Sequence, residues 1–405
     1  MALSVSSWFK VQLESTGVQP VRKFWVNSTD YTSRVLKWPK IVRTANEYRA
    51  TTINISLANN DGALNTFYIT TYNMLADCTL QLGYTTDSGT IEAATLYRGK
   101  LQSVRYPKEG TCELKVRDRL WDFTQKKIGD TNSYMIDIGS TLPSDLAWTL
   151  CTCYGGMSTV ASTSNPDIDY TSFLEWAAQF SQDNLRVAAH YEGDKVTDAL
   201  ESIAKMTESA IWVDGGNKIR FCRFIEPSSI DTVITRSRTK NVAIDVEKQR
   251  VINKQYVFFD FSVASDYWLS VVEDVRSTSV SSWGSCEDIV QDKTVWFVDS
   301  AAALNLAQRR TDRFQFPPAI YKIDAALYGL EREIGETIRL VNSFYGVNSM
   351  GGFRIMGMDY DMDTGGIIFT LDEAAVGGGG GGYSSYYGGA FYLDYSDLDG
   401  NDMLL

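Results

Sequence analysis

The chain has a single histidine, His190, among its 405 residues. Metal sites built on several histidines, such as a His-Glu-x-x-His helix, are excluded by this count. A catalytic triad would have to use His190, and no Gly-x-Ser-x-Gly turn accompanies it. His190 follows the apolar residues 187–189, so we interpret it as a structural residue. Phosphate-binding glycine motifs are also missing, and we expect no catalytic residue and no cofactor.

Cysteine is scarce as well. A chain that matures in a reducing compartment usually keeps its thiols free, and free buried thiols are our expectation here. Cys151 and Cys153 lie in a predicted helix, where a spacing of two turns them to opposite faces. We therefore expect no metal site; a zinc or iron–sulfur centre is the alternative. The six cysteines are Cys78, Cys112, Cys151, Cys153, Cys222 and Cys286.

No apolar run approaches the roughly 18 residues that span a bilayer, and the N-terminus lacks a basic start followed by an apolar stretch. We expect a soluble protein without an export signal. The formal net charge of −12 disfavours binding to a phosphate backbone, because such binding depends on Lys and Arg. The length exceeds what one core usually organises, so we expect two to four packed units.

Both ends of the chain show the patterns of short strands. Apolar side chains alternate in 52–57, 78–82 and 112–116, and Asn59-Asn-Asp-Gly62 is typical of a turn. The same alternation returns after residue 226, with turns that contain glycine. Closely spaced strands of this kind favour a small barrel at each end.

The middle of the chain predicts helices and a hairpin. Ser144, Asp169 and Thr197 stand where helix N-caps are expected, ahead of apolar residues at helical spacing. Residues 210–213 and 218–224 flank Asp214-Gly-Gly-Asn217, which predicts a β-hairpin. A further helix is expected from Ser300 to about Arg313.

These patterns predict an α+β fold that is predominantly β. It would have two small β-barrel-like domains, an α+β domain between them and a small α/β insertion in the second barrel. We assign barrel domain I to residues 1–123, the α+β domain II to 124–225, barrel domain III to 226–262 with 318–376, the inserted domain IV to 263–317, and a flexible tail to 377–405.

Three acidic residues at every second position, Asp359, Asp361 and Asp363, suggest a calcium loop. That motif requires Gly at its sixth position and Glu at its twelfth, where this chain has Thr364 and Thr370. We therefore favour the outer face of a strand running into a hairpin turn at Gly365-Gly366.

The C-terminal tail begins with six glycines, residues 377–382, which cannot hold a fold and should act as a flexible tether. The residues beyond it are aromatic and acidic. We predict that this peptide docks onto a neighbouring subunit and orders there, with a frayed end as the alternative. The docking residues would be Phe391, Tyr392, Asp394 and Tyr395.

The order of these pieces, over most of residues 20 to 373, resembles the bacteriophage baseplate or tail-tip hub family. The segments that carry the resemblance are strand patterns and glycines without a catalytic signature. They are 25–32 with 53–62, Leu96-Tyr-Arg-Gly-Lys-Leu101, 199–213 with 216–221, and 334–341 with 353–360 and 366–371. The glycine-rich tail departs from the compact hub pattern.

The resemblance implies a structural virion protein without enzymatic activity, located at the tail tip and assembled in the host cytoplasm. In that family two barrel domains per subunit let a homotrimer match sixfold tail-tube or distal-tail rings on one side and a central fibre or spike on the other. DNA would pass through the lumen without specific binding, and an acidic lumen would repel it. The alternatives are a hexameric distal-tail or adaptor ring and a tail-associated glycan-binding or glycan-hydrolysing protein.

Overall fold

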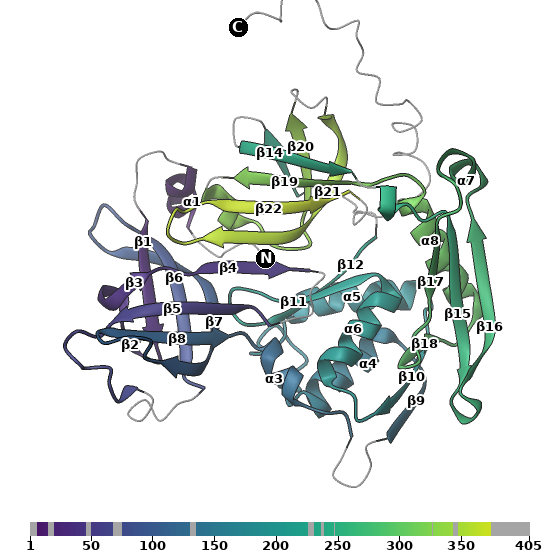
Figure 1. Ribbon diagram of the computed structural model, residues 1–405, viewed down its shortest axis with the longest axis horizontal. Coiled ribbons are helices and arrows are strands. Elements are labelled where there is room, and N and C mark those ends of the chain that lie inside the picture. Colours follow the sequence, from purple (N-terminus) through teal and green to yellow (C-terminus); the bar gives the residue numbers. More distant parts are fainter. Residues whose placement is uncertain are drawn as a thin grey trace, which may run out of the picture.

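The fold is α+β and predominantly β, with curled sheets that confirm the expected barrel-like architecture (Figure 1). In Figure 1 one seven-stranded sheet lies at the left and the other at the top, helices lie at the lower centre, and a three-stranded sheet lies at the right. The computed structural model describes residues 6–14, 20–45, 50–67, 75–129, 135–225, 231–235, 239–246, 248–325, 327–342 and 347–373.

The first sheet forms where the sequence alternates. Cys78, Leu80 and Leu82 are buried on one face of β6, and Cys112, Leu114 and Val116 are buried on β8, as predicted. Its strands, in spatial order, are β2 (Thr29–Asp30), β1 (Val21–Val26), β6 (Asp77–Thr85), β7 (Ile91–Arg105), β8 (Thr111–Arg117), β5 (Thr52–Ala58) and β3 (Val35–Lys37), with the 3-10 turn η1 (Thr32–Arg34) before β3.

The second sheet also has seven strands, and one of them comes from the N-terminal part of the chain. β4 (Lys40–Thr44) pairs with β21, so that Lys40 lies opposite Asp361. The sequence placed this segment in the first barrel, because strand patterns do not reveal the partner strand; in the structure it pairs with a strand of the second sheet. The other six strands, in spatial order, are β13 (Thr232–Thr235), β20 (Thr337–Asn342), β21 (Val347–Asp361), β22 (Ile367–Asp372), β19 (Ala319–Ala325) and β14 (Thr239–Val246). Two 3-10 turns, η4 (Lys248–Arg250) and η6 (Leu327–Glu331), lie in the same part of the chain.

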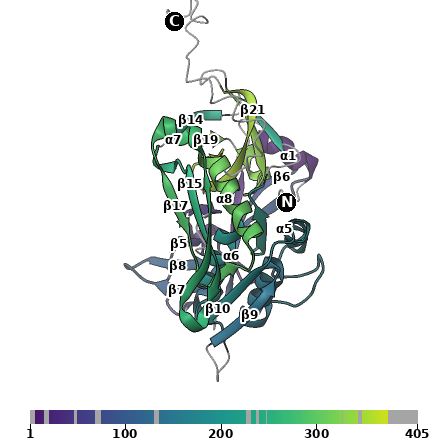
Figure 2. The same cartoon turned by 90° about the vertical axis from the view of Figure 1, so that its right-hand side faces the viewer.

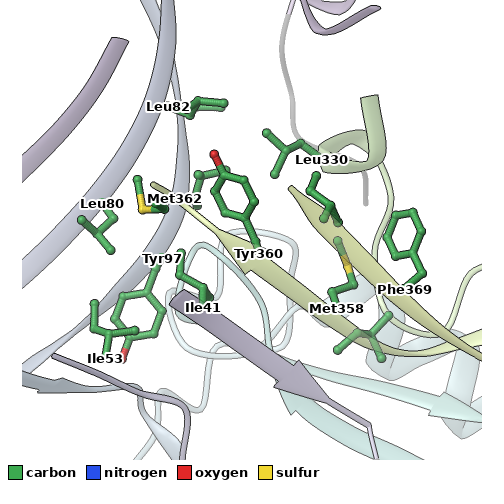
Figure 3. Packing of buried hydrophobic residues seen from close by; sticks show 14 of the residues in the cluster. Ile41, Ile53, Leu80, Leu82, Tyr97, Leu330, Met358, Tyr360, Met362 and Phe369 are labelled. Carbon is green, nitrogen blue, oxygen red and sulfur yellow. The ribbon is translucent and has the colours of Figure 1, made fainter. Parts of the chain in front are cut away.

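One continuous hydrophobic cluster joins the two seven-stranded sheets. Figure 3 shows Leu80 and Leu82 of the first sheet on one side and Met358 and Phe369 of the second sheet on the other, with Ile41 of β4 between them. The sequence predicted two barrel-like sheets, but it did not predict that their buried side chains would form a single continuous core. The two sheets are therefore held as one body by apolar packing.

The helix α1 (Ser7–Glu14) strengthens this junction, in a region where only strands and turns were expected. Phe9 is fully buried and its ring meets Tyr84 of the first sheet edge-on, with ring centres 5.1 Å apart. Lys10 reaches Glu331 of the second barrel-like part, with an N–O distance of 3.8 Å.

Helices and short strands form the middle part. Asp169 caps α5 by accepting the backbone N–H of Ser172, as predicted. Ser144 and Thr197 do not act as caps, because their helices begin at Pro143 and Val196. The elements are α3 (Leu120–Gln125), β9 (Met135–Thr141), α4 (Pro143–Thr149), the π-helical turn η2 (Leu150–Tyr154), α5 (Tyr170–Gln182), β10 (Val187–Glu192), α6 (Val196–Thr207), and the hairpin β11 (Ser209–Val213) and β12 (Ile219–Arg223).

The inserted part faces the reader in Figure 2. Its sheet has the order β16-β15-β17, and α8 packs on it. The sequence assigned the segment of β15 to the second barrel, but β15 pairs with β16 and β17. The elements are β15 (Lys254–Ser262), η5 (Val263–Ser265), β16 (Tyr267–Val275), α7 (Ser277–Trp283), β17 (Glu287–Val290), β18 (Val295–Phe297) and α8 (Ser300–Phe314); β18 joins β10 of the middle part.

The shared cluster gives a testable prediction. Ile41→Ala should lower the free energy of unfolding by about 2–5 kcal/mol, because it leaves a cavity between the two sheets. The neighbouring side chain of Val42 is 46% exposed on the same strand, so Val42→Ala should cost less than about 0.5 kcal/mol. Urea unfolding of the purified variants measures both values, and equal effects would contradict the role given to Ile41.

Candidate assembly surfaces

His190 lies on β10 between two carboxylates. Its Nδ1 is 2.5 Å from Asp137 Oδ1 and its Nε2 is 3.1 Å from Glu192 Oε1. Burial alone would lower the pKa of His190, but the two hydrogen bonds to carboxylates outweigh it and the pKa is raised. Both ring nitrogens are therefore occupied by acids that favour the charged imidazolium, an arrangement unlike that of a general base beside a nucleophile.

The cysteines behave as small apolar residues. Cys151 is buried and Cys153 is exposed, as expected for opposite faces of a helix. Burial raises the pKa of Cys78 and Cys151 to about 12 and that of Cys112 to about 11, which makes these thiols poor nucleophiles and poor ligands. Among the residues that the structure describes, no group of three or more His, Cys, Asp or Glu is placed to hold a metal ion.

The acidic triplet takes the hairpin conformation that we favoured. Asp359 pairs with Lys40 of β4 at 2.5 Å, Asp361 accepts the backbone N–H of Asp363, and Asp363 accepts the backbone N–H of Trp38. Asp361 and Asp363 also border an open hollow of about 450 Å³. Because each carboxylate already fixes a strand or a turn, these acids hold β4 on β21 and do not converge as a catalytic pair.

A buried ion cluster fastens the inserted part to the middle part. Glu208, directly after α6, binds Arg313 at 3.0 Å and Arg309 at 3.1 Å, both from α8. Asp183, at the end of α5, binds Arg223 of β12 at 2.6 Å. Arg223 and Arg313 are almost fully buried, and burial lowers their pKa while the neighbouring acids oppose this shift.

A second ion cluster connects the middle part to the second barrel-like sheet. The buried guanidinium of Arg220 is 3.0 Å from Asp169 and 3.9 Å from both Asp214 and Glu333. Glu333 belongs to the loop before β20, so this contact crosses between parts. Sequence analysis missed both clusters, because their arginines have the spacing of an ordinary solvated helix face or strand.

The outward face of the first sheet is basic although the whole chain is acidic. Cationic side chains alternate with buried apolar ones along its strands, so they share this face. Asp77 and Glu113 are acidic residues of the same face, and Asp77 pairs with Lys100 at 2.7 Å. The cations are Lys23, Arg98, Lys100, Arg105, Lys115 and Arg117.

The outer face of the inserted sheet is mostly apolar and exposed, with Glu273 and the Lys254–Glu287 ion pair toward one end. β16 alternates between exposed and half-buried residues along its whole length, and Tyr267, Leu269, Val271 and Val275 are between 43% and 53% exposed. Ile289 of β17 adds a further exposed apolar side chain. The sequence did not single out this face, because Trp268 and Val272 place apolar side chains on the other face of β16 as well.

The tail residues predicted to dock, Phe391, Tyr392, Asp394 and Tyr395, lie outside the described residues. In the described part of the chain, none of the helices is both long and apolar enough to cross a bilayer.

The fold is shared with solved bacteriophage tail proteins. The 43 kDa tail protein of prophage MuSo2 from Shewanella oneidensis matches 89% of this chain and 100% of its own, with a TM-score of 0.56 at 12% identity. A tail protein from Neisseria meningitidis MC58 matches 88% and 98%, with 0.55 at 13% identity. Prophage tail protein gp18 from Listeria monocytogenes EGD-e matches 87% and 94%, with 0.51 at 11% identity. No protein-family model and no curated protein sequence matches the chain.

The cluster around Glu208 gives a second prediction. Glu208→Gln should cost about 3–5 kcal/mol of unfolding free energy, because it leaves the buried Arg313 and the half-buried Arg309 without a full counter-charge. Glu201→Gln is the matched control on α6, since its pair with Lys205 is exposed and should be worth less than about 0.5 kcal/mol. Chemical denaturation tests this, and a small effect at Glu208 would show that α8 is held mainly by apolar contacts.

The raised pKa of His190 gives a third prediction, on pH dependence. Its stabilising contribution should be complete below the unfolded pKa of about 6.5 and should disappear as the pH rises through the higher folded pKa. The stability difference between the native chain and His190→Gln should therefore shrink on going from acidic to alkaline pH. Denaturation across that range measures it, and a difference that grows with pH would contradict the assignment.

Proposed function

We propose that this chain, which has the fold of bacteriophage tail proteins, is a structural virion protein that forms the central hub of a tail tip or baseplate. The observation that carries the proposal is the extent of the match. Nearly the whole chain aligns with nearly the whole length of three tail proteins, so the shared architecture is not limited to one common sheet. Shared fold alone leaves function open, and the proposal joins it to the chain's own sheet organisation.

The number of sheets in the chain supports a trimer. Two seven-stranded curled sheets occur in one polypeptide and are fixed to each other by β4 and by a common apolar cluster. Three copies of such a subunit would present six similar sheets around one axis. We therefore propose a homotrimer that joins a sixfold tail-tube or distal-tail ring to a central fibre or spike protein.

The basic face of the first sheet bears on the proposed DNA conduit. We expected an acidic lumen, which would repel DNA as it passes. A lumen lined by this sheet's outward face would carry Lys23, Arg98 and Lys100 instead. We propose that this face meets an acidic neighbouring protein of the tail and that the acidic surface of other parts of the subunit lines the lumen.

We keep the domain division proposed from the sequence, with two changes: residues 40–44 are added to barrel domain III, and the inserted domain IV begins near residue 254. We propose a role without catalysis, because the one histidine and the acidic triplet are both engaged in holding strands together. The protein would then be located in the virion, at the tail tip, after assembly in the host cytoplasm.

The copy number tests this proposal. We expect native mass spectrometry and negative-stain images of the purified full chain, alone or with its tail-tube partner, to give rings of three subunits with six similar density lobes. Six subunits per ring would favour the hexameric adaptor and would overturn the hub assignment, because each subunit would then supply a single ring position.

A further inference from the structure

β16 is an exposed edge strand with an apolar outer face. In the described part of the chain no strand pairs with its outer edge, and its nine residues contain neither Lys nor Pro; its charges are Glu273 and Asp274, close to its C-terminal end. Val271 lies opposite Phe258 of β15, and Tyr256 of β15 lies opposite Ile289 of β17, so the apolar outer face continues across the sheet. A long apolar edge of this kind is a template for another strand, and proteins normally cover or charge it.

The last described residues of the chain lie near the start of β15, the strand next to β16. Asp372, the last residue of β22, binds Arg250 at 2.7 Å, and the backbone N–H of Glu373 bonds to Ala319, shortly after α8. Arg250 lies just before β15, whose first residue, Lys254, is paired with Val275 at the end of β16. Glu373 therefore lies toward the end of the inserted sheet at which β16 finishes, with Val275.

The tail has the sequence of an added strand. Phe391, Leu393 and Tyr395 alternate with Tyr392, Asp394 and Ser396, the period of a strand with one apolar face. Residues 374–390, with their glycine run, can extend up to about 55 Å, which exceeds the length of the nine-residue strand β16. The linker is therefore long enough to place the segment anywhere along this edge.

We propose that residues 391–396 add to the outer edge of β16 of the same molecule as an antiparallel strand. Phe391, Leu393 and Tyr395 then continue the apolar face that Leu269 and Val271 begin, and main-chain hydrogen bonds saturate the edge. In the antiparallel direction the segment enters the edge at its Val275 end and runs toward Tyr267, the arrangement that needs the shorter span of linker. A neighbouring subunit was the partner expected from the sequence, but the molecule's own edge is nearer and is present at a high effective concentration. This inference does not depend on the proposed role in a tail.

Hydrogen–deuterium exchange on the full chain tests it. Leu393→Pro removes a backbone donor within the proposed strand, whereas Ser385→Pro makes the same change nearer the glycine run and serves as the control. We expect peptides covering Tyr267–Val275 to exchange at least about tenfold faster in Leu393→Pro than in the native chain. In Ser385→Pro they should match the native chain, and peptides from β6 and β22 should be unchanged in both variants.

Two results would overturn the proposal. Equal exchange of β16 in all three proteins would show that the tail does not cover the edge. Protection of β16 that increases with protein concentration, over about a hundredfold range, would show that the covering strand comes from a second molecule. Protection that is independent of concentration and is lost only in Leu393→Pro supports addition within one molecule.

Discussion

The arrangement of this protein depends on the passage of residues 35–44 from one sheet to the other. β3 pairs with β5 in the first sheet, and β4, only two residues later, pairs with β21 in the second. The intervening Trp38 is fixed by the Asp363 carboxylate, and Ile41 enters the apolar cluster shared by both sheets. A short connection, strand pairing and apolar burial therefore act at the same place, and independent motion of the two sheets would require breaking the β4–β21 pairing and exposing the shared cluster.

The other parts are attached by charge as well as by apolar packing. Glu208 receives two arginines from α8, and Arg220 reaches toward Glu333 of the second barrel-like part. Such buried pairs add little net stability, because each ion loses its hydration, but an unpaired partner is costly. They therefore select one relative position of the parts, which suits a subunit whose neighbours must find fixed surfaces.

Local sequence patterns predicted local structure well. The alternation at 78–82 and 112–116, the cap at Asp169, the hairpin around 214–217 and the helix from Ser300 all appear as expected. Partner strands were not predictable, since the alternation in β4 and β15 is the same whichever sheet they join. Ser144 failed as a cap because Pro143 starts the helix one residue earlier. The exposed apolar face of β16 could not be recognised from the sequence, because apolar residues occur on both faces of this strand.

The pairing of Lys40 with Asp361 has a consequence for how the chain acquires its structure. About three hundred residues separate these partners. During synthesis, β4 therefore remains without its partner strand β21 for a time on the order of tens of seconds. Until then Ile41 lacks the apolar surroundings that bury it in the finished molecule. The nascent chain must keep this segment from premature association, and the junction can form only after β21, to Asp361, has left the ribosome.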